Sequence, residues 1–303
     1  MAQLTNHAIH NKYFRKLPQM GVFFKVGPGQ EYLQFFNLVY ELSPTALMSL
    51  FVLSLFRLGP IIVMAPFLGS KLPSPVKVGL MISLSVILLP HIAMTSQTML
   101  EFNWALVCYA AKELFIGLVF AFLICVPFQF AQSAGVIIDF VRGSSSLQVS
   151  DPFSQAQSSP IGNLYNYLLI VIFYAMGGLF LLLNTLIVSY TVLPVDSMIN
   201  PAFFSLKLPF WQILTGVTAQ LFAIAIQLSA PALLAVLMTE VFLGIANRLA
   251  PQVQIVFLGM SLKSLIGLAM LCLGWIFILK QLEKETLLWM NEMHKVIFMI
   301  PKI

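Results

Sequence analysis

The sequence predicts an all-α membrane protein, and three observations support that fold class. Hydrophobic residues make up 59% of the 303-residue chain and charged residues only 9%, whereas a soluble domain carries about 25% charged residues. The apolar residues gather in long continuous runs and not in the short alternating segments of a β-barrel. Prolines interrupt most of these runs, so we expect helical hairpins whose helices are broken at prolines.

Six apolar runs are candidate membrane spans, each of which needs about 20 residues. They are Thr45–Leu68, Val76–Met94, Trp104–Ala131, Leu164–Leu193, Trp211–Ala246 and Val253–Leu279. The fifth run is longer than one span and has Pro231 near its centre, so it is expected to form two helices or one bent helix. Gly177 and Gly178, inside the fourth run, predict a kink or a close helix contact. Broken helices at membrane depth favour a channel or transporter-like assembly over a passive anchor.

Three parts are expected: a polar N-terminal extension (1–44), a helical domain (45–280) and an amphipathic C-terminal tail (281–303). The tail is expected either to lie on the surface or to dock a partner. Cations in the extension, near Lys71 and Lys77, and in the tail all favour the cytoplasmic side. Simple spans cannot satisfy these preferences together, so some runs are hairpins that do not cross, or the protein is not an ordinary bundle.

Charged residues inside the runs need partners. An Arg at the bilayer centre costs about 2.5–3.5 kcal/mol, so Arg57 is expected to face protein or water beside an acid or carbonyl groups; the alternative is an Arg that reaches out of a thin membrane region. Lys112 and Glu113 are adjacent, and adjacent residues do not face each other on a helix, so each is expected to have its own partner. Asp139 and Arg142 are three residues apart, which predicts an ion pair across one turn.

The segment "MTEVFLGIANRLAPQVQ" has the densest charge pattern. Glu240 and Gly244 share a helix face, Arg248 lies two turns beyond Glu240, Pro251 ends the helix, and Lys263 follows in the next run. A small residue between charged ones allows close helix approach. The pattern fits a proton relay or ion pairs between subunits, and the second is favoured because no two carboxylates have a spacing suited to acid–base work.

No catalytic motif occurs, and the three cysteines lie inside apolar runs without metal-ligand or disulfide spacing. The cations are scattered and form no basic run that would bind nucleic acid. The sequence therefore predicts a protein that is not an enzyme, holds no cofactor or metal, and does not bind nucleic acid.

The stretch "RGSSSLQVSDPFSQAQSSPIG", from Arg142 to Gly162, contrasts with the rest of the chain. It holds seven Ser and three Gln, and its charged residues are Arg142 and Asp151. Loops beyond about 12–15 residues are usually functional or disordered. The length of this stretch therefore favours a functional loop, and the alternative is a plain exposed loop between helices.

Several motifs, in this order, resemble the FliR/SctT family of type III secretion export proteins: "FRLGP", "APFLG", "LPSPVKVGL", "QSAGVIIDFVRG", "SDPFSQAQSSPIGNL" and "LSAPALLAVLMTEVFLGIANRLAPQVQIVFLGMSLKSLIGL". The resemblance covers residues 45–280. The segments "GGLFLLLNTLIVSYTVLPVDS" and "DPFSQAQSSP" are more similar to the virulence (SctT) branch than to the flagellar one.

The resemblance implies an export-gate subunit in the bacterial inner membrane, multi-pass, at the base of a secretion system. Its implied partners are SctR/FliP-like and SctS/FliQ-like subunits, an SctU/FlhB-like switch protein, the membrane, and unfolded secreted proteins in transit. It also implies that charges pair between subunits or support helix packing. The residues concerned are Arg57, Glu113, Asp139, Arg142, Glu240, Gly244, Arg248, Pro251 and Lys263.

The family's loop at this position lies in the pore and plugs it. The resemblance implies that the loop here acts as such a plug, with Gly143, Ser144, Ser145, Ser146, Leu147, Asp151, Pro152, Phe153 and Gln155 as its expected residues. Ser, Gln and Gly supply weak, exchangeable hydrogen bonds, while Leu147 and Phe153 are expected to seat the loop against an apolar ring. The alternative function is an ion-coupled secondary transporter that uses Glu240, Arg248 and Lys263. It predicts an inverted internal repeat, which the two halves of the chain do not show.

Overall fold

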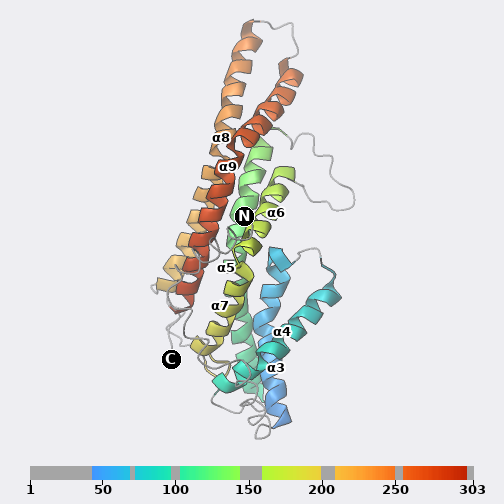
Figure 1. The fold of residues 1–303 in the computed structure, drawn as a ribbon, viewed down its shortest axis with the longest axis vertical. Coiled ribbons are helices and arrows are strands. Elements are labelled where there is room, and N and C mark those ends of the chain that lie inside the picture. The colour runs from blue at the N-terminus through green and yellow to red at the C-terminus, as the bar shows by residue number, and fades with distance from the viewer. Residues whose placement is uncertain are drawn as a thin grey trace, which may run out of the picture.

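The computed structural model describes residues 43–68, 72–96, 103–143, 159–198, 209–249 and 255–298, and these ranges are helical without strands (Figure 1). The elements are α3 (Pro44–Met64), the 3₁₀ turn η2 (Pro66–Leu68), α4 (Ser74–Thr95), α5 (Trp104–Val141), α6 (Pro160–Ala175), α7 (Gly178–Val192), α8 (Pro209–Leu249) and α9 (Ile255–Phe298). Five of these helices are long and apolar enough to cross a membrane, or six spans result if α6 and α7 form one bent span. The predicted all-α membrane fold is confirmed.

The prolines inside the apolar runs do not break the helices, contrary to expectation. Pro60, Pro90, Pro127 and Pro231 all lie inside helices that continue on both sides of them. Since a proline removes a single backbone hydrogen bond, a long, well-packed helix can continue through it. The fifth run is accordingly one helix, α8.

The break in the fourth run occurs at glycine. Helices α6 and α7 meet at an angle of 72°, and Gly177 between them has φ +73°, a left-handed backbone that other residues adopt at a cost. The kink predicted from the paired glycines is therefore present. In the last run, α9 continues without a break past residue 281, so residues 281–298 of the predicted tail are the end of a 44-residue helix.

Helix α5 is the centre of the packing. It lies against α3, α6 and α8, and Figure 1 shows it running through the middle of the molecule. Gly117 lets α3 come close, because a Cβ there would overlap the carbonyl group of Arg57. Phe128 of α5 packs with Phe67 of η2 and with Phe173 of α6, its ring centroid 5.6 Å from each, and the rings of Phe67 and Phe173 are 4.8 Å apart. These contacts fix α3 and α6 on the central helix.

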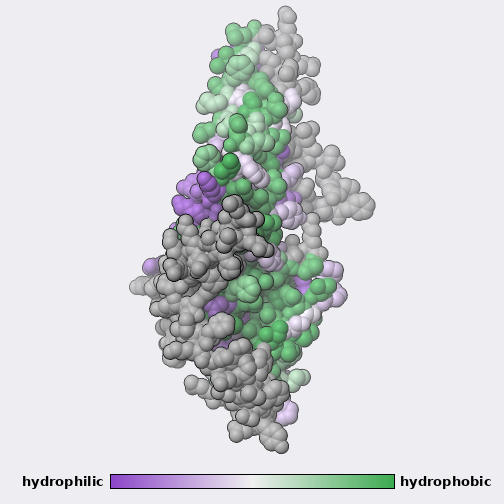
Figure 2. Space-filling model, viewed as in Figure 1, coloured by the Kyte–Doolittle hydropathy of each residue, from purple (hydrophilic) through white to green (hydrophobic). Residues whose placement is uncertain are grey.

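Helices α8 and α9 form a long hairpin that runs along one edge and extends past the other helices (Figure 1). In the most apolar 18-residue stretch of α5, 61% of the residues are buried inside the chain. The corresponding shares are 28% for α8 and 17% for α9. The exposed apolar side chains of the hairpin include Phe242, Leu273 and Phe277. The projecting part of the hairpin is largely green in Figure 2. The hairpin thus leaves most of its apolar surface for lipid or for neighbouring proteins.

Candidate functional site: two buried polar clusters

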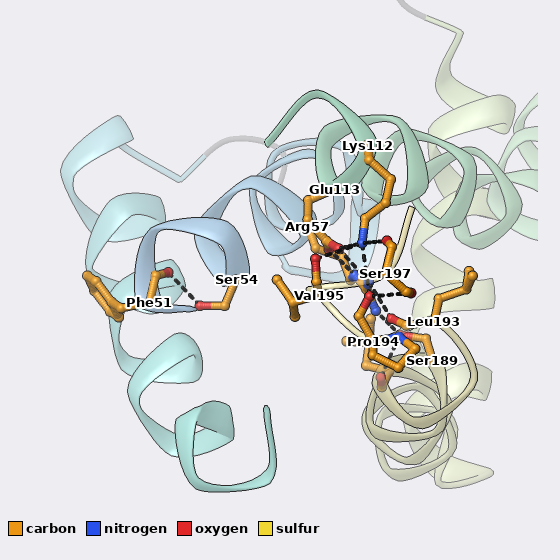
Figure 3. A network of polar contacts seen from close by, with 11 residues as sticks. Phe51, Ser54, Arg57, Lys112, Glu113, Ser189, Leu193, Pro194, Val195 and Ser197 are labelled. Carbon is orange, nitrogen blue, oxygen red and sulfur yellow. Dashed lines mark hydrogen bonds and ion pairs between the residues drawn. The ribbon is translucent and has the colours of Figure 1, made fainter. Parts of the chain in front are cut away.

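The first cluster joins α3 to α5 and is called the Arg57 cluster (Arg57, Lys112, Glu113 and Ser189; Figure 3). Arg57 and Glu113 are both fully buried. Arg57 Nη2 donates to Glu113 Oε1 over 2.8 Å, and Arg57 Nε donates to Glu113 Oε2. This two-point contact is the strong, geometrically specific form of an Arg–carboxylate pair. The prediction that Arg57 faces protein and pairs with an acid is confirmed.

The remaining donors of Arg57 reach the end of α7. Arg57 Nη1 donates to Ser189 Oγ (3.1 Å) and Nη2 also donates to the carbonyl oxygen of Leu193 (2.9 Å). The guanidinium carbon lies 4.1 Å from the centre of the Tyr190 ring, at cation–π distance. A single side chain therefore links three helices that are far apart in sequence.

Lys112 and Glu113 each have a partner of their own, as expected, because Glu113 binds Arg57 and Lys112 binds backbone carbonyl oxygens; they also contact each other. Lys112 Nζ lies 2.8 Å from Glu113 Oε1, so these adjacent residues do bind each other. The spacing rule concerns the directions in which side chains leave the helix, and a four-carbon side chain can bend round to its neighbour. The same Nζ donates to the carbonyl oxygens of Pro194, Val195 and Ser197, each at 2.9 Å. A cation beyond the C-terminus of α7 also complements the helix dipole.

The second cluster holds together the two ends of the polar stretch and is called the Asp139 cluster (Asp139, Arg142, Ser159 and Ile161). Asp139, near the end of α5, accepts hydrogen bonds from Arg142 Nη2 (2.7 Å), Ser159 Oγ (2.5 Å) and the backbone N–H of Ile161 (2.9 Å). The predicted pair of Asp139 and Arg142 is confirmed. Ser159 in turn caps α6, because its Oγ accepts from the N–H of Gly162 at 2.9 Å.

Sequence reasoning missed Ser159 and Ile161. The available signal was the pair Ser159–Pro160, because Ser at the cap and Pro at the first helical position mark the start of a helix. Nothing in the local pattern indicates that the cap also binds Asp139 on the preceding helix. The two helices approach closely there, since a Cβ on Gly135 would overlap the backbone at Gly162.

The end of α5 and the start of α6, which the polar stretch connects, therefore lie close together. Helix α5 ends at Val141 and is followed by Gly143 with φ +83°, while α6 begins at Pro160. Of the predicted plug residues, Gly143 is described. The others lie outside the described residues: Ser144, Ser145, Ser146, Leu147, Asp151, Pro152, Phe153 and Gln155.

Two charges of the hairpin pair with each other. Lys263 Nζ on α9 is 2.5 Å from Glu240 Oε1 on α8, and their side chains are 25% and 43% exposed. Gly244 makes no close helix contact among the described residues, because a Cβ there would have no neighbour within 4 Å. Arg248 is exposed in the last turn of α8, and Pro251 lies outside the described residues. The described residues hold no group of three His, Cys, Asp or Glu that could bind a metal ion.

Comparisons with known proteins show the family of this chain. Residues 48–288 match the family described as bacterial export proteins, family 1. The chain is 31% identical to Yop proteins translocation protein T of Yersinia pestis over 225 residues, which cover 74% of this chain and 84% of that protein. It is 28% identical to the surface presentation of antigens protein SpaR of Shigella flexneri over 217 residues (70% and 80%). It is also 28% identical to the flagellar biosynthetic protein FliR of Bacillus subtilis over 245 residues (80% and 91%).

These matches confirm the FliR/SctT resemblance, on the SctT branch. They also imply that the chain works beside other subunits of an export apparatus, as a multi-pass membrane protein. The family consists of structural components of secretion systems and not of enzymes. The chain belongs to family 1 of the bacterial export proteins and has a role in a type III export apparatus.

Proposed function

We propose that this chain is a core subunit of the type III secretion export gate in the bacterial inner membrane. Together with SctR/FliP-like and SctS/FliQ-like subunits, and beside an SctU/FlhB-like switch protein, residues 45–280 form the entry pore for unfolded secreted proteins. The observation that carries the proposal is the exposure of the α8–α9 hairpin: of the most apolar 18-residue stretches of α8 and α9, only 28% and 17% are buried within the chain.

The charges on this hairpin indicate what covers it. Glu240 is exposed and its partner Lys263 is half-buried, on a hairpin whose exposed side chains are mostly apolar. A charged group facing hydrocarbon costs several kcal/mol, on the order of 2.5–3.5 per residue on insertion scales. A protein neighbour or a water-filled pore therefore suits this face better than lipid does. The ion-coupled transporter is not proposed, because Glu240 and Lys263 bind each other on an exposed face and Arg248 is exposed as well.

The polar stretch between α5 and α6 serves as the plug of this pore. The Asp139 cluster holds its two ends together, which fixes the points where the stretch leaves α5 and joins α6. A segment rich in Ser and Gln cannot bury enough apolar surface to fix itself, and its displacement costs little free energy. Leu147 and Phe153 give it a weak apolar seat.

Deleting Ser144–Ser150 tests the plug. The assembly carrying the deletion is expected to leak ions and small solutes at rest, while its subunits still co-purify in normal amounts. Replacing Leu147 and Phe153 by Ser is a milder variant that keeps the loop length, and it is expected to leak less than the deletion. A membrane that stays as tight as wild type in both variants rejects the plug.

A further inference from the structure

A cleft of about 410 Å³ lies between α5 and the α8–α9 hairpin and opens at the surface. Val126 and Phe130 of α5 are buried and supply part of its apolar lining. Trp289 of α9 also lines the cleft, and its Nε1 donates to the carbonyl oxygen of Leu123 over 3.0 Å, which fixes the ring against α5. The cleft therefore has a firmly held apolar interior, which suits the carbon stem of an incoming side chain.

The polar groups of the cleft come in two pairs with the same spacing. Helix α9 contributes Glu285 and Glu292, and α8 contributes Gln220 and Gln227. Residues seven apart lie on one face of a helix, about 10.5 Å apart along its axis. Glu285 is half-buried and Glu292 is exposed. The described residues that line the cleft include these two carboxylates and no Lys or Arg, so the lining is formally anionic.

The carboxylates of the cleft and of the projecting part of the hairpin are arranged differently. In the projecting part, Glu240 of α8 is balanced by Lys263 of α9, with 2.5 Å between Oε1 and Nζ. At the cleft, Glu285 Oε1 accepts a hydrogen bond from Gln281 Nε2 at 2.9 Å, and a neutral amide leaves the charge of the carboxylate in place. A carboxylate that faces lipid tails is costly, and it repels anionic headgroups. The charge of the cleft therefore favours a cationic protein segment over lipid.

We propose that this cleft docks a helix of a neighbouring subunit that carries two Lys or Arg side chains seven residues apart. Two cations at that spacing on a helix are also about 10.5 Å apart, so they match the carboxylates of Glu285 and Glu292. Their methylene stems lie on the apolar lining of the cleft while their charged ends meet the carboxylates. The inference rests on the proposed function, since it states the chemistry of one neighbour that covers the hairpin.

The test is photocross-linking in the whole assembly, purified from the membrane in mild detergent. A benzoylphenylalanine probe replaces Ala223, which is exposed and lines the cleft, and mass spectrometry identifies the peptide that the probe captures. The charge of the cleft is removed by combining Glu285→Gln with Glu292→Gln, which keeps the size of both side chains. Glu283→Gln is the matched control, because Glu283 lies on the same helix and is not among the residues that line the cleft.

The probe is expected to capture one segment of another subunit that holds two cations seven residues apart. Capture is expected to fall about tenfold in the double variant, as for the loss of one hydrogen bond to a charged group, and to stay unchanged in Glu283→Gln. Unfolding of the isolated chain by SDS is expected to be the same with and without the double substitution, which separates lost docking from lost folding. Glu285→Lys is expected to lose capture as well, and to regain it when the captured cation is replaced by Glu.

The docking site is overturned if the probe captures nothing, or captures only lipid, a second copy of this chain or residues 1–42 of the same chain. Capture that is undiminished in the double variant, or equally diminished in Glu283→Gln, overturns it too. If the probe prevents assembly, the amount of companion subunits that co-purifies with each glutamate variant decides in the same way. Companions that co-purify without contacting the cleft leave the proposed function standing while the docking site fails, whereas a chain without companions refutes both.

Discussion

Replacing Glu113 by Ala removes the carboxylate that balances two buried cations. Glu113 and Arg57 are fully buried and Lys112 is 7% exposed, so neither cation can turn to water. Removing one partner of a buried ion pair costs about 3–5 kcal/mol, because the other charge is left without compensation. Two cations share Glu113, so the upper part of that range is expected for Glu113→Ala.

The free energy of unfolding is measured by SDS titration of the purified protein in mild detergent, followed by tryptophan fluorescence. The matched control is Glu240→Ala, which removes an acid from a pair whose side chains are 43% and 25% exposed. An exposed pair contributes about 0–1 kcal/mol. The expected difference between the two variants is therefore about 3 kcal/mol.

A double variant tests whether the lost stability comes from the uncompensated charge. Replacing Arg57 by Met and Glu113 by Leu removes both charges together, and apolar replacements of buried pairs are often neutral or stabilising. The double variant is expected to recover most of the stability lost in Glu113→Ala, since Lys112 keeps its three carbonyl partners. If Glu113→Ala is no less stable than Glu240→Ala, the Arg57 cluster does not hold these helices together.

Three further changes test the packing by the same titration, and the third is also followed by hydrogen exchange. Gly117→Ala is expected to cost about 1–3 kcal/mol, because its methyl group overlaps the carbonyl of Arg57; Gly79→Ala, with nothing within 4 Å, is expected to be neutral or stabilising by up to about 1 kcal/mol, and equal effects would contradict the contact. Gly177→Ala is expected to cost about 1–2 kcal/mol through its φ of +73°, and an unchanged stability would argue against the kink. Ser159→Ala is expected to cost about 0.5–2 kcal/mol by removing the cap of α6, and undisturbed exchange at the α6 N-terminus would count against that cap.

The helices could be predicted from the apolar runs, whereas several of their ends could not. The third run was expected to stop at Ala131, but α5 continues to Val141 because Ala134, Gly135 and Ile138 stay buried in the contact with α6. Polar residues such as Gln132 hide that continuation in a hydropathy profile. Residues 281–298 of the amphipathic tail share one helix with the last apolar run, which composition alone divides in two.

The partners within the polar clusters, too, could be predicted only in part from the sequence. An Arg in an apolar run requires a buried partner for energetic reasons, so the kind of partner of Arg57 was predictable. Its identity was not, because Ser189 and Leu193 lie more than a hundred residues away and no spacing connects them to α3. Asp139 and Arg142 were predictable because an ion pair across one turn depends only on local geometry.

The central claim is that these helices are built to pack against sister subunits around a protein-conducting pore. The most direct test is the native mass of whatever co-purifies with this chain from the membrane in mild detergent. The account predicts a defined complex in which the chain is accompanied by several copies of two other small hydrophobic subunits. Isolation of the chain as a stable monomer, with no companions under conditions that preserve membrane complexes, would contradict it.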